Sequence, residues 1–285
     1  LLDDDADGVC DELEVVGCTD DDACNFNINA TDESGDCDYC TCLPSNDDLP
    51  YTLTVEVHAE GIIEGMTTYR FYIDLVNDDD FLSSIYGNDE APLYLTTTTG
   101  FYNDLVGSST ASSIIPALIP LFPSVAADSW ITIGIDGQNV GNEVEISTIE
   151  SFEQPFVAAF SSGSDIDGHD VYMDDFTGGV WYVLNGTPNG LPDENGRVLF
   201  LQLTTAESFE AQINAQIFEN GIGSEDLRKT FSVDGVGTFY DNQYTICGCD
   251  DPIACNYDDS ATHNDGSCIF DCLGCTNSLA CNYDP

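Results

Sequence analysis

The acidic residues at the start of the chain have the types and the spacing of calcium ligands. Residues 3–14 fit the pattern D-x-[DN]-x-[DN]-G-x5-E at every defined position. A hard cation takes about six to eight oxygen ligands, and a tight loop supplies them by turning alternate carboxylates inward. An acidic, solvated linker is the competing interpretation, but it does not explain Gly8 or Glu14. The predicted Ca²⁺ ligands are Asp3, Asp5, Asp7, the carbonyl of Val9, Asp11 and Glu14.

A weaker acidic cluster lies near the middle of the chain. Asp165, Asp167 and Asp170 surround Gly168, so the segment is either a second calcium loop or a long turn. The whole chain carries 53 acidic and 4 basic side chains among 285 residues, a formal net charge of −49. Divalent cations would neutralise part of this charge, and Ca²⁺ is the cofactor that we expect.

All 13 cysteines lie near the two ends of the chain. The first block has six, which can close among themselves, whereas the second has seven and cannot. Six cysteines allow 15 pairings, so the connectivity is not readable from the sequence. Disulfides are preferred over zinc thiolates, because no two CxxC pairs stand at the spacing of a zinc-binding CxxC…CxxC frame, Cys272 and Cys275 lie across a repeat junction, and His263 is the only histidine nearby. The expected disulfide cysteines are Cys10, Cys18, Cys24, Cys37, Cys40, Cys42, Cys247, Cys249, Cys255, Cys268, Cys272, Cys275 and Cys281.

The two cysteine blocks repeat one sequence. Successive cysteines are 6 and then 13 residues apart in both blocks. The two sets are Cys18, Cys24 and Cys37, and Cys249, Cys255 and Cys268. A third copy begins at Cys275, 26 residues after Cys249, and the sequence ends before its third cysteine, so we expect a truncated repeat there.

The repeats are also rich in Asn and Asp. These side chains cap helices and close turns by accepting hydrogen bonds from nearby backbone N–H groups. That role and further calcium ligation are both open. The residues are Asp20, Asp21, Asn25, Asn27 and Asp32 in the first repeat, and Asp250, Asp251, Asn256, Asp258 and Asp265 in the second.

The phrase GCTD…ACNYD…AT…DGSC, assembled from both blocks, carries a family resemblance. It resembles a repeat of very large secreted surface proteins of marine Bacteroidetes, over about 60 residues at the two ends. The loop at residues 3–14 is similar to the calcium loops of thrombospondin type 3 or dockerin-like repeats. The resemblance implies an exported, multi-repeat, adhesive or structural protein, often secreted by the type IX route, with no enzyme activity attached to the repeat.

The chain between the cysteine blocks alternates polar and apolar residues with the period of β-strands. Residues 67–75 place Tyr69, Phe71 and Ile73 on one face and Arg70 on the other. Many strands, frequent glycine-containing turns and no alternation with helices predict an all-β fold, an antiparallel, jelly-roll-like β-sandwich flanked by small disulfide-bonded calcium-binding repeats. The expected domains are 1–46 (calcium loop plus Cys-rich repeat), 47–246 (β-sandwich), 247–271 (Cys-rich repeat) and 272–285 (truncated repeat).

Individual strands follow from the same pattern, and helical patterning is scarce. Short helical turns are expected at residues 80–86 and 112–121. The predicted strands cover residues 51–57, 67–75, 130–136, 143–149, 156–160, 180–184, 198–203, 211–218 and 230–236.

The central domain offers little for catalysis. It has two histidines, His58 in a predicted strand and His169 in an acidic turn, and it lacks a Gly-x-Ser-x-Gly motif. Paired carboxylates are too abundant to be informative, so we expect no enzyme activity. Aromatic side chains could stack on sugars, although most aromatics in a sandwich belong to its core. The candidates for a glycan site are Trp130, Trp181, Tyr102 and Tyr182.

The sequence therefore predicts an extracellular, secreted or cell-surface structural or adhesive module of a long repetitive protein or filament. Its expected partners are neighbouring modules of the same chain, identical chains in a homo-oligomeric fibre, and surface glycans. Four basic residues are too few for nucleic-acid binding, and no apolar run is long enough to span a membrane. The cations Arg70, Arg197, Arg228 and Lys229 are expected to pair with carboxylates. A calcium-dependent, lectin-like adhesin domain is the alternative function.

Overall fold

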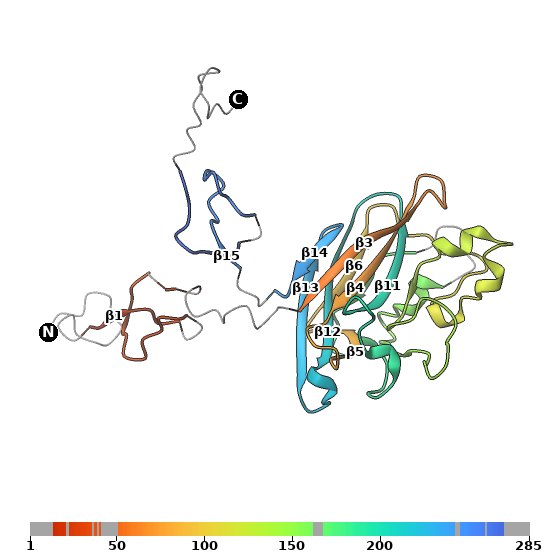
Figure 1. Cartoon of the computed structure of the whole chain (residues 1–285), viewed down its shortest axis with the longest axis horizontal. Helices are drawn as coiled ribbons and strands as arrows, with labels where there is room; N and C mark the ends of the chain where they lie inside the picture. The colour runs from red at the N-terminus through yellow and green to blue at the C-terminus, as the bar shows by residue number, and fades with distance from the viewer. Residues whose placement is uncertain are drawn as a thin grey trace, which may run out of the picture. The chain divides into compact units, whose positions relative to one another are not determined.

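The computed structural model describes residues 14–20, 23–35, 37–38, 40, 51–161, 168–242, 246–259 and 261–270. The chain forms two compact units (Figure 1). Residues 49–243 form one, here called the sandwich unit. Residues 1–48 and 244–285 together form the other, the flanking unit.

One sheet of the sandwich unit has five antiparallel strands. In spatial order they are β14 (Gly237–Tyr240), β3 (Thr52–Glu60), β4 (Thr67–Asp74), β11 (Arg197–Thr205) and β7 (Trp130–Ile131). Alternation of side chains turns Phe71 and Ile73 of β4 into the core and places Arg70 and Tyr72 on the opposite face. The predicted two-faced strand at residues 67–75 is therefore confirmed.

The second sheet has seven strands. They are β5 (Phe81–Gly87), β6 (Leu93–Thr97), β8 (Ser147–Ile149), β9 (Val171–Met173), β10 (Gly179–Tyr182), β12 (Phe209–Phe218) and β13 (Asp226–Val233). The long strand β12 pairs with β13 along one side and with β5 and β6 along the other. All of these pairings are antiparallel.

A single apolar core joins the two sheets. Phe71 and Phe200 of the five-stranded sheet and Phe231 of the seven-stranded sheet are fully buried in it. Phe71 lies with its ring centroid 5.3 Å from that of Phe209 of β12, so the two sheets contact each other directly. The antiparallel β-sandwich predicted from the sequence is confirmed.

The remaining regular structure consists of 3-10 helices. They are η1 (Ala111–Ser113), η2 (Pro116–Leu118), η3 (Pro123–Ala127), η4 (Val157–Phe160), η5 (Pro188–Gly190) and η6 (Glu219–Gly221). Ala111, Ile114 and Val125 form a smaller apolar cluster with Tyr72 and Leu199 on the outer face of the five-stranded sheet. The segment that contains η1 to η3 therefore covers part of that face.

Two local predictions are wrong. The helical turn expected at residues 80–86 is strand β5, which is buried on both faces and so shows no alternation. The strand expected at residues 156–160 is instead helix η4 with its N-cap Phe156, and Phe156, Ala159 and Phe160 point inward at a spacing near three residues. The turns expected at residues 112–121 occur as η1 and η2.

Each repeat of the flanking unit contains one short parallel strand pair. The first pairs β1 (Val16–Gly17) with β2 (Asp32–Glu33), and the second pairs β15 (Cys247–Gly248) with β16 (His263–Asn264). Within the described part of the chain, no helix has the length and apolar character needed to cross a membrane.

Candidate functional site

Three disulfides of known pairing brace the flanking unit. Cys18 pairs with Cys37 in the first repeat, and Cys249 pairs with Cys268 in the second, each across 19 residues. Cys24 and Cys255 are disulfide-bonded as well. Disulfides thus occur in both cysteine blocks, as the sequence predicts. The remaining cysteines lie outside the described residues, and they are Cys10, Cys42, Cys272, Cys275 and Cys281.

The first block does not close on itself, contrary to the expectation from its even cysteine count. Cys40 pairs with Cys247 of the second block, across 207 residues. The number of cysteines cannot reveal this pairing. A block with an even number of cysteines can close on itself, but it can equally form an even number of disulfides to cysteines elsewhere in the chain. The disulfide joins the segment that precedes the sandwich unit to the segment that follows it.

The two repeats fold with the same hydrogen bonds. The amide of Thr31 donates to the Val15 carbonyl at 2.9 Å, and the amide of Thr262 donates to the Ile246 carbonyl at 2.8 Å. A single parallel bridge joins Cys18 to Phe26 in one repeat and Cys249 to Tyr257 in the other. The repetition in sequence is therefore also a repetition in structure.

Asparagine side chains hold the backbone of each repeat. Asn25 Oδ1 accepts from the amide of Asp38 at 2.8 Å, and Asn256 Oδ1 accepts from the amide of Ile269 at 2.7 Å. Asp251 Oδ1 accepts from the amide of Ile253 two residues on. The Asp251 contact is a turn of the kind predicted for the Asx residues, whereas the two asparagine bonds join segments 13 residues apart.

The first repeat also contains a carboxylate close to sulfur. Glu33 lies beside Cys37, with 3.4 Å between Oε1 and Sγ, and its other oxygen accepts from the hydroxyl of Thr19 at 2.6 Å. The bond from Thr19 and bonds from backbone amides hold the pKa of Glu33 below its usual value. Although Cys18, Glu33 and Cys37 cluster as metal ligands do, both sulfurs are bonded to each other, so the trio is not a metal site.

Most of the predicted calcium ligands lie outside the described residues. This holds for Asp3, Asp5, Asp7, Val9 and Asp11, and for Asp165 and Asp167 of the weaker cluster. Glu14 and Asp170 are described. Asp170 Oδ1 accepts from the amide of Thr97 at 3.1 Å, which ties its segment to strand β6.

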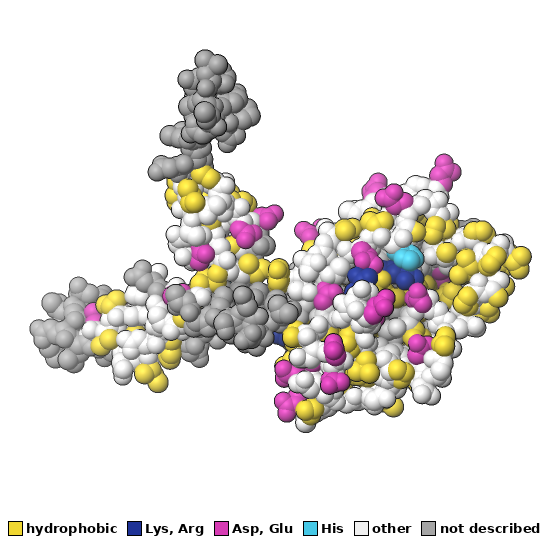
Figure 2. All heavy atoms as spheres, viewed as in Figure 1, with side chains coloured by type: hydrophobic (Ala, Val, Ile, Leu, Met, Phe, Trp, Pro, Cys, Tyr) yellow, Lys and Arg dark blue, Asp and Glu magenta, His cyan; other side chains and the backbone are white. Residues whose placement is uncertain are grey.

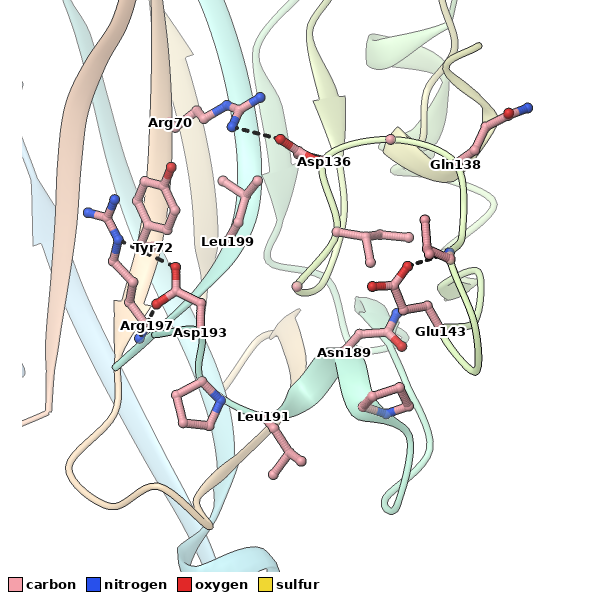
Figure 3. A pocket seen from close by; sticks show the side chains of 16 residues that line it. Arg70, Tyr72, Asp136, Gln138, Glu143, Asn189, Leu191, Asp193, Arg197 and Leu199 are labelled. Carbon is pink, nitrogen blue, oxygen red and sulfur yellow. Dashed lines mark hydrogen bonds and ion pairs between the residues drawn. The ribbon is translucent and has the colours of Figure 1, made fainter. Parts of the chain in front are cut away.

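A pocket of about 380 Å³ opens on the outer face of the five-stranded sheet (Figure 3). Strands β4 and β11 supply Arg70, Tyr72, Arg197 and Leu199 to its floor. Its walls are the loops at residues 134–143 and 188–193. The register of β4 against β11 places Tyr72 opposite Leu199, so residues far apart in sequence meet on one face.

Arg197 is held rigidly at one side of this pocket. Its guanidinium binds Glu56 through two nitrogens, at 2.9 and 3.1 Å, and lies 3.8 Å over the ring of Tyr72. The bond from Arg197 holds the pKa of Glu56 below its usual value. Asp193 lies 3.9 Å from Arg197 Nε, so two carboxylates share one cation, and a bidentate, stacked guanidinium of this kind has little freedom to reorient.

Arg70 holds a similar position at the other side. Its Nε donates to Gln202 Oε1 at 3.0 Å and its Nη1 donates to Asp136 Oδ2 at 3.2 Å. Trp130 lies beneath it, with the guanidinium 5.7 Å from the ring centroid. Burial, and after it the charge of Arg70, lowers the pKa of His58. The Asp136 carboxylate is two-thirds exposed and faces solvent at the rim.

The walls of the pocket are fixed by backbone contacts. Gly134 has a φ of +72°, and a Cβ built there would lie 1.8 Å from the carbonyl oxygen of Asn189. Only glycine fits this position, because both the conformation and the close approach exclude a side chain. The side chain of Asn189 bonds to the amide and the carbonyl of Val144, which joins the two loops.

The aromatic candidates for sugar stacking are placed differently from one another. Trp130 and Trp181 are buried, and the indole N–H of Trp181 donates to the carbonyl of Thr132 at 3.1 Å, so both belong to apolar clusters. Tyr102 and Tyr182 are half-buried. A sugar in the pocket of Figure 3 would therefore meet charged and amide groups rather than an exposed indole.

A second hollow, of about 560 Å³, lies beside Tyr102 and Asp104. The Tyr102 hydroxyl donates to Asp104 at 2.8 Å, and burial raises the pKa of Tyr102 to about 12. Asp128 is fully buried behind it and accepts from the amides of Asp104 and Ser108, both at 2.7 Å. Burial outweighs these bonds and raises the pKa of Asp128 to about 7.

All four cations pair with carboxylates within the sandwich unit, as predicted. Arg228 pairs with Asp226 at 3.3 Å and Lys229 with Asp241 at 2.7 Å, in addition to the pairs of Arg70 and Arg197. Figure 2 shows basic side chains and a histidine close together among acidic ones on the visible face of the unit. This gathering is not apparent from the sequence, whose only signal is the arginine on the outward face of the predicted strand at residues 67–75.

No protein-family model, curated protein or solved structure is significantly similar to this chain. The disulfides indicate a protein that matures in an oxidising compartment rather than in the cytosol.

Proposed function

We propose that the chain is a non-catalytic structural or adhesive module of a long, repetitive, extracellular surface protein. One observation carries the proposal: two repeats that share several hydrogen bonds precede and follow the sandwich unit in the chain and are joined through Cys40–Cys247. Repeats that are braced in this way suit a connector between larger modules, since each contains its own cross-link.

Calcium is proposed as the ion that stiffens these connectors. The support is the ligand pattern at residues 3–14 and the net charge of −49, which divalent ions would partly neutralise. Identical chains would associate laterally in the same conditions, with bound ions screening the repulsion between acidic surfaces.

The test compares the full chain in millimolar calcium and in chelator. We expect small-angle scattering to give a longer, better defined particle with calcium, and calorimetry to detect calcium binding that Glu14→Gln weakens at least tenfold. Glu90→Gln is the matched control, because it makes the same substitution at an exposed glutamate of the sandwich unit. A particle of unchanged dimensions and assembly in chelator would contradict the proposed role of calcium.

Glycan binding is the second candidate function, and the pocket of Figure 3 favours it. Arginine–carboxylate pairs present donors and acceptors side by side, which is what the hydroxyls of a sugar need. A glycan array probed with and without calcium tests this function. Asp136→Asn should lose any bound glycan, whereas Asp78→Asn, at an exposed loop outside the pocket, should retain it. An array without binding in either condition would exclude this candidate.

A further inference from the structure

The three paired disulfides of the flanking unit lie in series along the chain. Cys18–Cys37 is followed by Cys40–Cys247, and that bond is followed by Cys249–Cys268. Only residues 37–40 and 247–249 connect one disulfide to the next. A covalent path from Cys18 to Cys268 therefore passes through two very short backbone segments and three sulfur–sulfur bonds.

We infer that this series of bonds carries mechanical tension past the sandwich unit. The inference rests on the proposed function, in which the chain is one link of a long array. Force applied outside a closed loop passes through the bond that closes it, so residues 41–246 stay unloaded while Cys40–Cys247 is intact. The bond holds the two Cα atoms at 5.7 Å and leaves no slack to extend.

The geometry of the sandwich unit shows what tension would do to it without the Cys40–Cys247 bond. Its first strand, β3, and its last, β14, are antiparallel neighbours, with Thr52 directly opposite Tyr240. Tension that entered at Thr52 and left at Tyr240 would pull two paired residues apart at the end of one ladder. The hydrogen bonds between β3 and β14 would then break one after another instead of sharing the load.

The loop closed by Cys40–Cys247 contains a large length of chain. An extended chain spans roughly 3.3–3.6 Å per residue, so release of the 207-residue loop would lengthen the link by about 70 nm. The two 19-residue loops of the repeats would each release at most about 6 nm by the same measure, because Cys24 and Cys255 inside them are also disulfide-bonded. With all three bonds intact, a link keeps its length even when its sandwich unit unfolds.

Single-molecule pulling of the full chain between two marker domains tests the inference. The oxidised wild-type chain should show the steps of the markers and no step near 70 nm. The double variant C40S/C247S, which leaves no new unpaired thiol, should add a step of about 70 nm at a force below that of the markers. The matched control C18S/C37S also removes one complete disulfide, and any step that it adds should be no longer than about 6 nm.

Two results would overturn the inference. One is a step near 70 nm in the oxidised wild-type chain. The other is the absence of that step in a C40S/C247S chain whose sandwich unit is shown by circular dichroism to be folded. The sandwich unit would then resist the tension without the Cys40–Cys247 disulfide. Should the variant fail to fold, reduction of the wild-type chain while it is held at constant force replaces it, with the step of about 70 nm and, in addition, the shorter releases of the two repeat loops. None of these results depends on calcium, so they are independent of the test of the proposed function.

Discussion

The two units of this chain are stabilised by opposite means. Phe71, Phe200 and Phe231 are completely buried in the sandwich unit, which contains no cysteine between residues 49 and 243. In the described part of the flanking unit, the buried apolar residues are two cysteines and two alanines. Large apolar side chains there, such as Ile28 and Ile253, are more than four-fifths exposed. A segment too short to enclose a core can still fold when sulfur bonds and side-chain-to-backbone hydrogen bonds replace apolar burial.

Chemical reduction should produce the largest difference in stability between the two units. A reductant removes the cross-links of the flanking unit, which are worth about 2–5 kcal/mol each in small domains, and finds no target in the sandwich unit. Hydrogen exchange followed by mass spectrometry should show loss of protection at the amides of Thr31 and Thr262 and full protection in β12. Protection that persists at both threonines after reduction would contradict this account of the flanking unit.

A substitution in the apolar core should destabilise the sandwich unit and leave the disulfides of the flanking unit intact. Phe200→Ala should destabilise the sandwich unit by about 3–5 kcal/mol, because Phe200 is fully buried in β11 and its loss leaves a cavity. Urea denaturation monitored by the fluorescence of Trp130 and Trp181, both in this unit, measures the effect. Phe152→Ala is the control, since that ring is 99% exposed and its removal should change stability by less than about 0.5 kcal/mol. Disulfide mapping should give the same pairs in both variants.

A buried carboxyl should make the stability of the sandwich unit depend on pH between about 4 and 7. The pKa of Asp128 is about 7 in the folded chain and about 3.9 when unfolded, so the folded state binds more protons between these values. The stabilisation is complete below about pH 4 and is lost as the pH rises to about 7, with a slope of at most ~1.4 kcal/mol per pH unit. In urea titrations, the stability difference between Asp128→Asn and wild type should vary over this range. A constant difference from pH 4 to 7 would show that Asp128 does not titrate there.

The smallest expected effect concerns equivalent positions of the two repeats. Asn25→Ala and Asn256→Ala each remove one acceptor of a backbone amide, which should cost about 1 kcal/mol locally. Exchange at the amides of Asp38 and Ile269 should accelerate by a similar factor in the two variants. Asn29→Ala, which replaces an exposed side chain of the first repeat, is the control and should leave the Asp38 amide unchanged. Unequal acceleration would indicate that the repeats differ in stability despite their shared bonds.

The sandwich was predictable where one face of a strand is buried and the other is not. Residues 67–75 alternate strictly, because β4 has the core on one side and the pocket on the other. Strand β5 was misassigned because both of its faces are covered, so its sequence carries no period of two. Helix η4 was misassigned because a short apolar run does not distinguish a strand from a turn of helix.

The sites depend on contacts between distant residues, which the sequence does not display. The repeat spacing predicted two equivalent cross-linked segments, but the partner of Cys40 lies 207 residues away. The pocket needs the register of β4 against β11 to bring Arg70 and Arg197 to one face. Without that register, the four cations of the chain indicate only that each will find a carboxylate.

The edge strands of the two sheets affect how readily closely spaced copies of this chain would aggregate by strand pairing. Four of the five edge strands, β7, β8, β9 and β14, have only two to four residues. The long edge strand, β13, is obstructed at its middle, where the Thr230 amide donates to Asp241 and the Thr230 carbonyl accepts from the amide of Asn242. Along these four short edges and at the middle of β13, a foreign strand finds only short rows of open backbone groups, which disfavours pairing of closely spaced copies through their sheets.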